Sequence, residues 1–363
     1  MKPHDRPYRY GLWTCLILLG GLSAGRAAEP YRTKTATQPS EIATCVQAAR
    51  TALEADDPQA ARTATERFFT ADSATGRTNA EKILRYEMAT TLKWALLTTG
   101  RLNDDFLSYG NIPEMSLMLP ISFPATKIAR PYSRLVMACG LYVPAMSTMI
   151  CDIDRNGIDN FSARLMTEIC LNTGRLTLAR RYLSYLPKAE QGRWFSRFPQ
   201  YRQAHWAWDS LPYYLPSEPS TTDAWVHFFY PLNAAERAAL RLSDEQARCL
   251  LDYYTLLQLL HKRLDLLPAI IDAYRAQGAT RLPAYVQEAW LFAMNYLNGG
   301  LSKEELLQWR NGDLKIEPDV IDRFERWFYV FTALRNGTGS WNDLHENYGD
   351  TYAFYFIFDG IAF

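Results

Sequence analysis

The phrase Thr99-Gly100-Arg101-Leu102 ends one apolar stretch of the chain, and a second copy, Thr173-Gly174-Arg175-Leu176, ends another. Cys139-Gly140-Leu141 ends a third apolar stretch between them. The three glycines lie 40 and 34 residues apart, and glycine commonly stands directly after the last turn of a helix. Repeats of this length are typical of stacked helical hairpins. The phrase therefore predicts an all-α chain built from antiparallel helix pairs.

The clearest predicted hairpin spans residues 160–186. Gly174 separates its two helices, and Pro187 ends the second one. Apolar residues recur at steps of three and four, as on one side of a helix; they are Phe161, Leu165, Ile169, Leu176, Ala179, Leu183 and Leu186. Two helices joined at a glycine cannot cover both apolar sides by themselves, so we expect the hairpins to stack on one another.

Capping residues predict where several other helices begin. Asp57 before a proline is typical of a helix start, and Thr78 with Glu81, like Ser243 with Gln246, matches the capping box. The predicted helix starts are Ser40, Pro58, Thr78, Ser243 and Pro283. An apolar stripe predicts one more long helix that stops at Asn336-Gly337; its residues are Val320, Phe324, Trp327, Phe331 and Leu334. For the apolar tail, residues 351–363, we expect a docked segment, either a short strand or a helix.

The hairpin corners resemble tetratricopeptide-like repeats. Gly174, Leu176 and Ala179 stand as the glycine, the large apolar residue and the small residue of that repeat. Gly140 and Ala145 occupy the same frame, whereas the earliest copy lacks the small residue. Most of the repeat's other signature residues are missing. The resemblance implies a TPR-like α-solenoid whose repeats are degenerate.

Three longer stretches resemble an uncharacterised family of Bacteroidetes cell-envelope proteins, known as a domain of unknown function. They are TLKWALLTTGRLNDDFLSYG from Thr91, FSARLMTEICLNTGRLTLARRYLSYLPKAEQGRWF from Phe161, and Gly349-Asp350-Thr351-Tyr352-Ala353-Phe354-Tyr355. The resemblance implies a helical fold and an envelope setting. It assigns no functional residue.

The N-terminus has the composition of a secretory signal peptide. Basic residues precede the short apolar run from Leu12 to Leu19, and small residues follow it through Ala28. We predict that residues 1–27 are a signal peptide cleaved after Ala27 and that residues 28–39 are a flexible leader. The alternative is a retained membrane anchor, but the run is shorter than the roughly 20 residues that span a bilayer.

Cleavage would remove four basic residues and one acidic residue, which leaves a net charge near −3. Nucleic-acid binding needs a basic surface, so the charge argues against it. No later segment is apolar and long enough to span a membrane. Five cysteines remain, an odd number, and all stand in apolar helical contexts where a free thiol acts as a small hydrophobe.

A connection rich in proline and aromatic residues, residues 198–242, divides two predicted helical regions, 40–197 and 243–363. So many aromatic side chains indicate burial against the helices. The alternative is an exposed aromatic surface that stacks on sugar rings, with Trp206, Trp208, Trp225 and Tyr230 as the ligand contacts. His205 and His227 lie close to these residues.

Motifs for catalysis and metal binding are weak. Asp152-x-Asp154-x-Asn156-Gly157 resembles the start of a calcium loop, but Ala163 replaces the carboxylate required at its twelfth position. We interpret it as a turn between helices. Acidic neighbours such as Asp104-Asp105 suit a helix start better than a catalytic pair. The sequence predicts no catalytic residue, no metal site and no cofactor.

These observations favour a non-catalytic helical-repeat scaffold in the cell envelope that binds a protein partner. A glycan-binding or glycan-processing protein with an aromatic cleft is the alternative. A structural module of a larger membrane assembly is a third class.

Overall fold

The computed structural model describes residues 39–71, 78–109, 126–191, 242–297 and 315–358. These residues form helices and connections and no strand, which confirms the all-α prediction. The first helices are α2 (Pro39–Ala55), α3 (Pro58–Ala71), α4 (Asn79–Thr98), α5 (Leu102–Asp105), the 3-10 helix η1 (Phe106–Tyr109), α7 (Thr126–Ala138), α8 (Tyr142–Asn156), α9 (Asn160–Asn172) and α10 (Leu176–Leu183). The later ones are α15 (Asp244–Leu260), η4 (Leu264–Leu266), α16 (Leu267–Ala276), α17 (Ala284–Leu297), α19 (Pro318–Arg335), α20 (Trp341–Tyr348) and α21 (Tyr352–Phe358).

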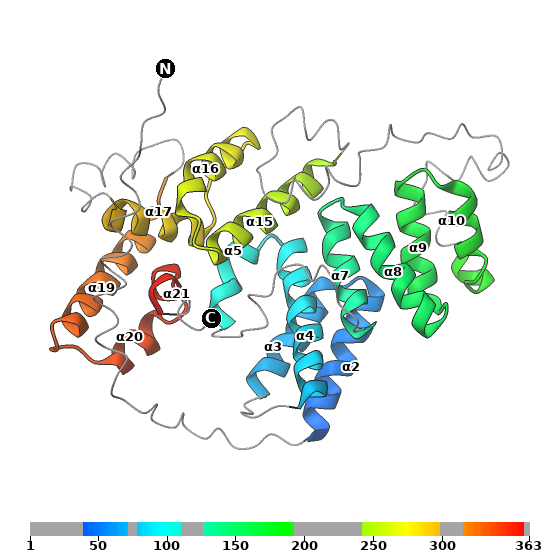
Figure 1. Cartoon of the computed structure of the whole chain (residues 1–363), viewed down its shortest axis with the longest axis horizontal. Coiled ribbons are helices and arrows are strands. Elements are labelled where there is room, and N and C mark those ends of the chain that lie inside the picture. Colours follow the sequence, from blue (N-terminus) through cyan, green and yellow to red (C-terminus); the bar gives the residue numbers. More distant parts are fainter. Residues whose placement is uncertain (1–38, 72–77, 110–125, 192–241, 298–314, 359–363) are drawn as a thin grey trace, which may run out of the picture.

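Helices α2 to α10 pack in chain order. The contacting pairs are α2 with α3, α3 with α4, α4 with α7, α7 with α8, α8 with α9, and α9 with α10 (Figure 1). The predicted caps are present: Asp57 accepts the amide of Ala60, and Thr78 forms the capping box with Glu81. Arg50 of α2 and the buried Glu87 of α4 form a two-pronged ion pair, with N–O distances of 2.6 and 2.7 Å.

The corner glycines have the backbone conformation that their role requires. Gly100, Gly140 and Gly174 have φ angles of 68°, 74° and 71°. This left-handed region costs other residues energy because a side chain would approach the following carbonyl. The amide of each residue directly after these glycines bonds back to a carbonyl of the helix just ended. The predicted helix ends at these three glycines are therefore confirmed, and the chain turns there.

Helix α15 lies across two of these corners, which brings the C-terminal part of the chain onto the N-terminal helices (Figure 1). A Cβ atom on Gly140 would lie 2.3 Å from Cδ2 of Leu242, which stands just before α15. A Cβ atom on Gly100 would lie 3.7 Å from the guanidinium of Arg248. Gln246, which closes the predicted capping box, also donates to the Tyr142 hydroxyl at 2.6 Å.

The C-terminal helices share an aromatic core. Trp327 of α19 is 1% exposed and stacks on Phe331 at a centroid distance of 5.2 Å. The predicted stripe of α19 faces this core, with Leu334 partly buried at its end. Helix α21 confirms the docked tail as a helix over residues 352–358. One contiguous hydrophobic cluster extends from α2 to α21 through α4, α15 and α17.

Candidate functional site

The aromatic residues proposed as ligand contacts, Trp206, Trp208, Trp225 and Tyr230, lie outside the described residues. His205 and His227 lie outside them as well. The sugar-stacking prediction therefore stays a prediction.

A polar pocket lies between the α4–α5 corner, α15, α16 and the connection to α17. We call it the corner pocket. Its volume is about 780 Å³, within the range common for ligand sites. It is lined by Gly100, Asp104, Asp244, Glu245, Arg248, Asp252, Tyr274 and residues 277–283. Gly100 belongs to the phrase that marks the first hairpin corner.

The floor of the corner pocket is a buried hydrogen-bonded group. The Tyr274 hydroxyl donates to Oδ1 of Asp252 at 2.6 Å. Asn103 of α5 donates from Nδ2 to the Asp252 carbonyl at 2.8 Å and to the Tyr274 hydroxyl at 3.3 Å. The Asn103 Oδ1 atom is buried and has no hydrogen-bond partner among the described residues. Three helices thus hold the Asp252 carboxyl in one orientation.

Burial changes the acidity of this group. Removal from water raises the pKa of Asp252 to about 6, against the opposing effects of the Tyr274 hydrogen bond and the positive charge of Arg248. The pKa of Tyr274 is raised well above its ordinary value, first by burial and then by the charge of Asp252. Asp252 therefore exchanges its proton close to neutral pH, as acid–base and ligand-binding carboxyls often do.

At the rim of the pocket, Asp104 connects α5 with the residues that lead into α17. Its Oδ1 accepts the amide of Ala284, the first residue of α17, at 2.8 Å, and its Oδ2 lies 3.4 Å from Arg281. The Arg281 guanidinium also donates to both carboxylate oxygens of Glu317, at 2.6 and 2.9 Å. The Asp104 side chain thus serves the start of α17, while its neighbour Asp105 pairs with Arg101 of the corner phrase. From the sequence, Asp104 and Asp105 were expected only to stabilise the start of their own helix, so the contact of Asp104 with α17 was not predicted.

The calcium-like motif forms a helix end. Asp152 lies inside α8, is almost fully buried, and pairs with Arg130 at 3.1 Å. Gly157 ends α8, and Asp159 caps α9 through the amide of Ser162. The predicted turn between helices is confirmed. Within the described ranges, no group of three or more His, Cys, Asp and Glu side chains has a geometry that could hold a metal ion.

The five cysteines of the described residues are free thiols. Four of them are buried, as their apolar context predicted, and burial raises the pKa of Cys170 to about 11 and of Cys249 to about 12. Cys151 is exposed, although its sequence context is apolar like that of the other four. It sits on the outer side of α8, one position before the buried Asp152.

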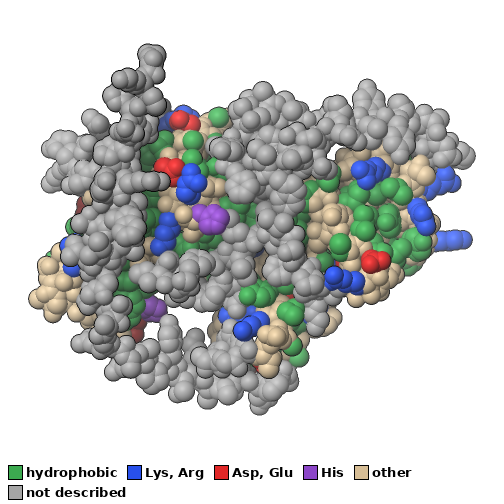
Figure 2. All heavy atoms as spheres, in the orientation of Figure 1, with side chains coloured by type: hydrophobic (Ala, Val, Ile, Leu, Met, Phe, Trp, Pro, Cys, Tyr) green, Lys and Arg blue, Asp and Glu red, His purple; other side chains and the backbone are tan. Residues whose placement is uncertain are grey.

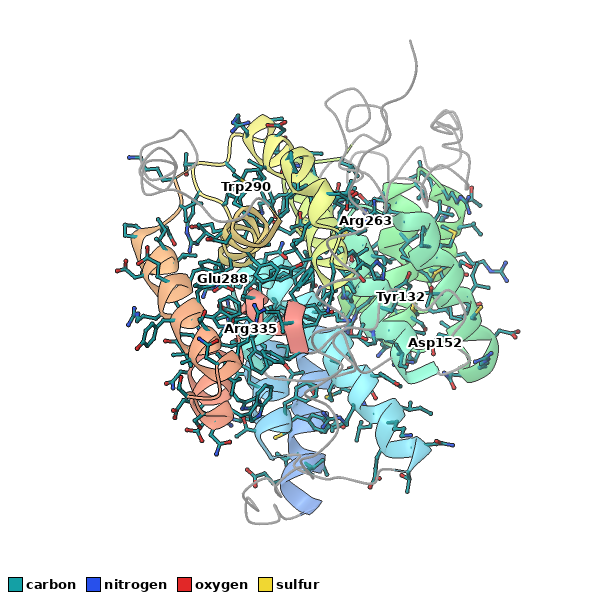
Figure 3. The ribbon with its side chains drawn as sticks, turned by 60° about the vertical axis from the view of Figure 1, so that its left-hand side comes forward. Tyr132, Asp152, Arg263, Glu288, Trp290 and Arg335 are labelled. Atoms are coloured by element: carbon teal, nitrogen blue, oxygen red, sulfur yellow. The ribbon has the colours of Figure 1, made fainter. Side chains whose placement is uncertain are left out.

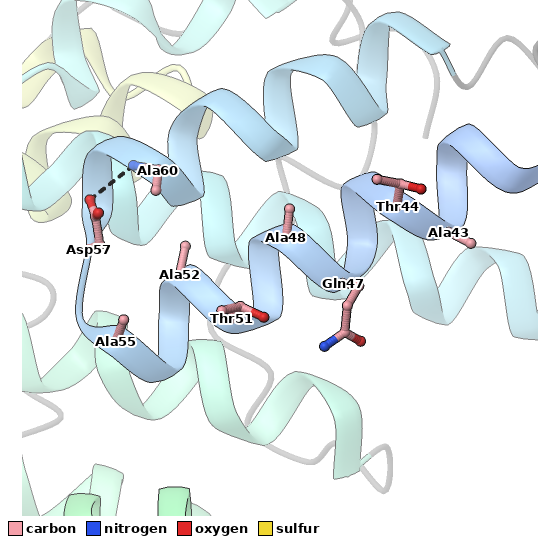
Figure 4. A pocket seen from close by; sticks show the side chains of 9 residues that line it. All are labelled: Ala43, Thr44, Gln47, Ala48, Thr51, Ala52, Ala55, Asp57 and Ala60. Carbon is pink, nitrogen blue, oxygen red and sulfur yellow. Dashed lines mark hydrogen bonds between the residues drawn. The ribbon is translucent and has the colours of Figure 1, made fainter.

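A second hollow is an open groove along α2, with a volume of about 710 Å³ (Figure 4). Its side chains are small and, apart from Asp57, uncharged: Ala43, Thr44, Gln47, Ala48, Thr51, Ala52, Ala55, Asp57 and Ala60. Other apolar side chains reach solvent at the opposite end of this helix series. Figure 2 shows hydrophobic side chains with basic ones around them in the region of α9 and α10, where Leu178 of α10 is 39% exposed and Tyr185, just after α10, is 51% exposed.

A buried acid also anchors the C-terminal helix. Glu288 of α17 (labelled in Figure 3) accepts a hydrogen bond from the amide of Tyr352 at 2.7 Å, and Tyr352 is the first residue of α21. Arg323 lies 3.9 Å from its other oxygen. Burial raises the pKa of Glu288 to about 7. This acid joins α17, α19 and α21.

Taken together, the helices and the two hollows define a helical protein with a polar pocket at a hairpin corner. The chain belongs to the family described as "Family of unknown function (DUF6057)", whose model matches residues 65–359. No curated protein and no solved structure matches the chain. None of the helices in the described ranges is both long and apolar enough to cross a membrane.

Proposed function

We propose that this protein is an exported, non-catalytic helical-repeat scaffold that binds a protein partner in the cell envelope. The observation that carries the proposal is the packing of α2 to α10 in chain order, with left-handed glycines at the corners after α4, α7 and α9. This arrangement supports a degenerate TPR-like stack. Stacked helical repeats expose extended surfaces, and protein recognition is their usual use.

The groove along α2 is the surface that we assign to the partner. Charged residues are depleted at the centres of protein interfaces, and this groove presents small uncharged side chains over several turns of α2. Small side chains also let another helix approach the α2 backbone closely. Export rests on the composition of residues 1–27, and the envelope setting rests on the family resemblance of the sequence.

Site-specific photo-crosslinking in envelope extracts tests the proposal. A crosslinking residue in place of Ala48, in the middle of the groove, is expected to capture one protein reproducibly. The same residue in place of Glu325, exposed on α19, is the matched control and is expected not to capture it. If Ala48 captures no protein while an oligosaccharide raises the melting temperature of the chain, the scaffold proposal is wrong and the glycan alternative is favoured.

A further inference from the structure

Two charged side chains in the corner pocket are available to a ligand. Asp252 is 7% exposed and lines the pocket, and its Oδ1 accepts a hydrogen bond from the Tyr274 hydroxyl. Arg248 is exposed and forms no ion pair with a carboxylate of the described residues. Both lie on α15 one turn apart, so their Cβ atoms are about 5–6 Å from each other on the same side of the helix.

The other charged side chains of the pocket either already have hydrogen-bond partners in the protein or lie exposed at its edge. Asp104 accepts hydrogen bonds from Arg281 and from the amide of Ala284 at the start of α17, and Arg281 also pairs with Glu317. Asp244 and Glu245 stand exposed in the first turn of α15. Among the lining residues, four carboxylates face two guanidinium groups. The excess of negative charge favours a positively charged group on the ligand.

We propose that the corner pocket binds a small zwitterion, an amino acid or short peptide, with its ammonium group on Asp252 and its carboxylate on Arg248. An amino acid holds these two groups close together, so it can bridge two side chains that stand one helical turn apart. Arg248 is suited to the carboxylate because a guanidinium offers two parallel donors to it. A neutral sugar would leave Arg248 without an anionic partner. The site is separate from the α2 groove, so it can be tested independently of the scaffold function.

Tyr274 and Asn103 act as positioning residues for this site. The Tyr274 hydroxyl donates to Oδ1 of Asp252 and accepts from Asn103, which holds the carboxyl in place at the pocket. Because these contacts exist without a ligand, little ordering is needed on binding. The raised pKa of Asp252 supports the assignment: an ammonium group beside the carboxyl favours its charged form, so binding should lower this pKa.

Isothermal titration of the full chain tests the inference. The probes are L-lysine and trialanine. Each is compared with one derivative whose α-amine is acetylated and with a second derivative whose terminal carboxylate is converted to an amide. We expect a zwitterion to bind and each blocked form to bind at least about tenfold more weakly. Binding of L-lysine alone would identify a free amino acid as the ligand class, and binding of trialanine would identify a peptide.

The variants Arg248→Gln and Asp252→Asn should each weaken binding about tenfold or more. Arg275→Gln is the matched control, since this exposed arginine of α16 pairs locally with Asp272 and does not line the pocket. Arg248 is exposed, so its variant keeps the test decisive even if Asp252→Asn fails to fold. The inference is overturned if neither probe binds at about 10 mM, if the blocked forms bind equally well, or if Arg248→Gln behaves like Arg275→Gln.

Discussion

Replacing Gly140 with Ala tests whether the glycine corner is also the place where α15 docks. Gly140 and Gly157 both have positive φ angles, 74° and 77°. They differ in their surroundings. A Cβ atom on Gly140 would lie 2.3 Å from Cδ2 of Leu242, whereas a Cβ atom on Gly157 would have nothing within 4 Å. The pair therefore separates backbone strain from a steric clash.

The magnitudes follow from these two terms. A left-handed alanine costs about 1–2 kcal/mol, and both substitutions carry this cost. Only Gly140→Ala adds overpacking against Leu242, which costs about 1–3 kcal/mol when neighbours must shift. We expect Gly140→Ala to destabilise the protein by about 2–5 kcal/mol and Gly157→Ala by about 1–2 kcal/mol. The effect of alanine on the unfolded chain is common to both and cancels in the difference.

Urea denaturation followed by far-UV circular dichroism measures both variants. The double variant Gly140→Ala with Leu242→Ala supplies a second check, because it removes the clashing methyl group. In the Leu242→Ala background, Gly140→Ala should cost no more than Gly157→Ala costs in the native chain. Equal costs for Gly140→Ala and Gly157→Ala in the native background would refute the docking of α15 on this corner.

Glu87→Gln removes the buried charge of the ion pair between α4 and α2, so we expect the free energy of unfolding measured with urea to fall by about 1.5–3 kcal/mol; Asp272→Asn, in an exposed pair, should change it by less than about 1 kcal/mol. Equal losses of stability in the two variants would contradict the burial of Glu87. The pKa of Glu288 rises from 4.5 in the unfolded chain to about 7 in the folded one, so the folded state retains the proton longer. Its stability contribution is present below pH 4.5 and is lost as pH rises to about 7. Glu288→Gln should flatten this slope in unfolding curves taken across that interval; an unchanged slope would assign it to other groups. Trp327→Ala should lower stability by about 3–5 kcal/mol, whereas Tyr329→Ala, 77% exposed in the native chain, should change it by less than about 0.5 kcal/mol, as thermal denaturation can show.

Local features of the helices were predictable because their causes are local. Thr78, Ser243 and Asp57 cap the helices that they were expected to cap, since a side-chain oxygen needs only the amides two or three residues later. The stripe of α19 and the turn at Gly157 depend equally on near neighbours. The exposure of Cys151 was missed, because its position within the mixed surface of α8 depends on which neighbouring helices cover that side.

The corner pocket could not be predicted in this way. Asp104, Asp252 and Tyr274 are far apart in the chain and belong to no recognisable motif. The spacing of Arg248 and Asp252 places them on one side of a helix, but the same spacing is common on solvated surfaces. Only the packing of α5, α15 and α16 removes Asp252 from water and gives it partners.

The sequence by itself determined that the described part of the chain is helical, that corners lie at Gly100, Gly140 and Gly174, and where several helices start. These depend on backbone conformation and short-range hydrogen bonds, which a few neighbouring residues specify. The tertiary structure alone decided that α15 crosses two of the corners and that a polar pocket forms beside Gly100. Such outcomes depend on which apolar surfaces bury one another, and side chains more than a hundred residues apart then share one environment.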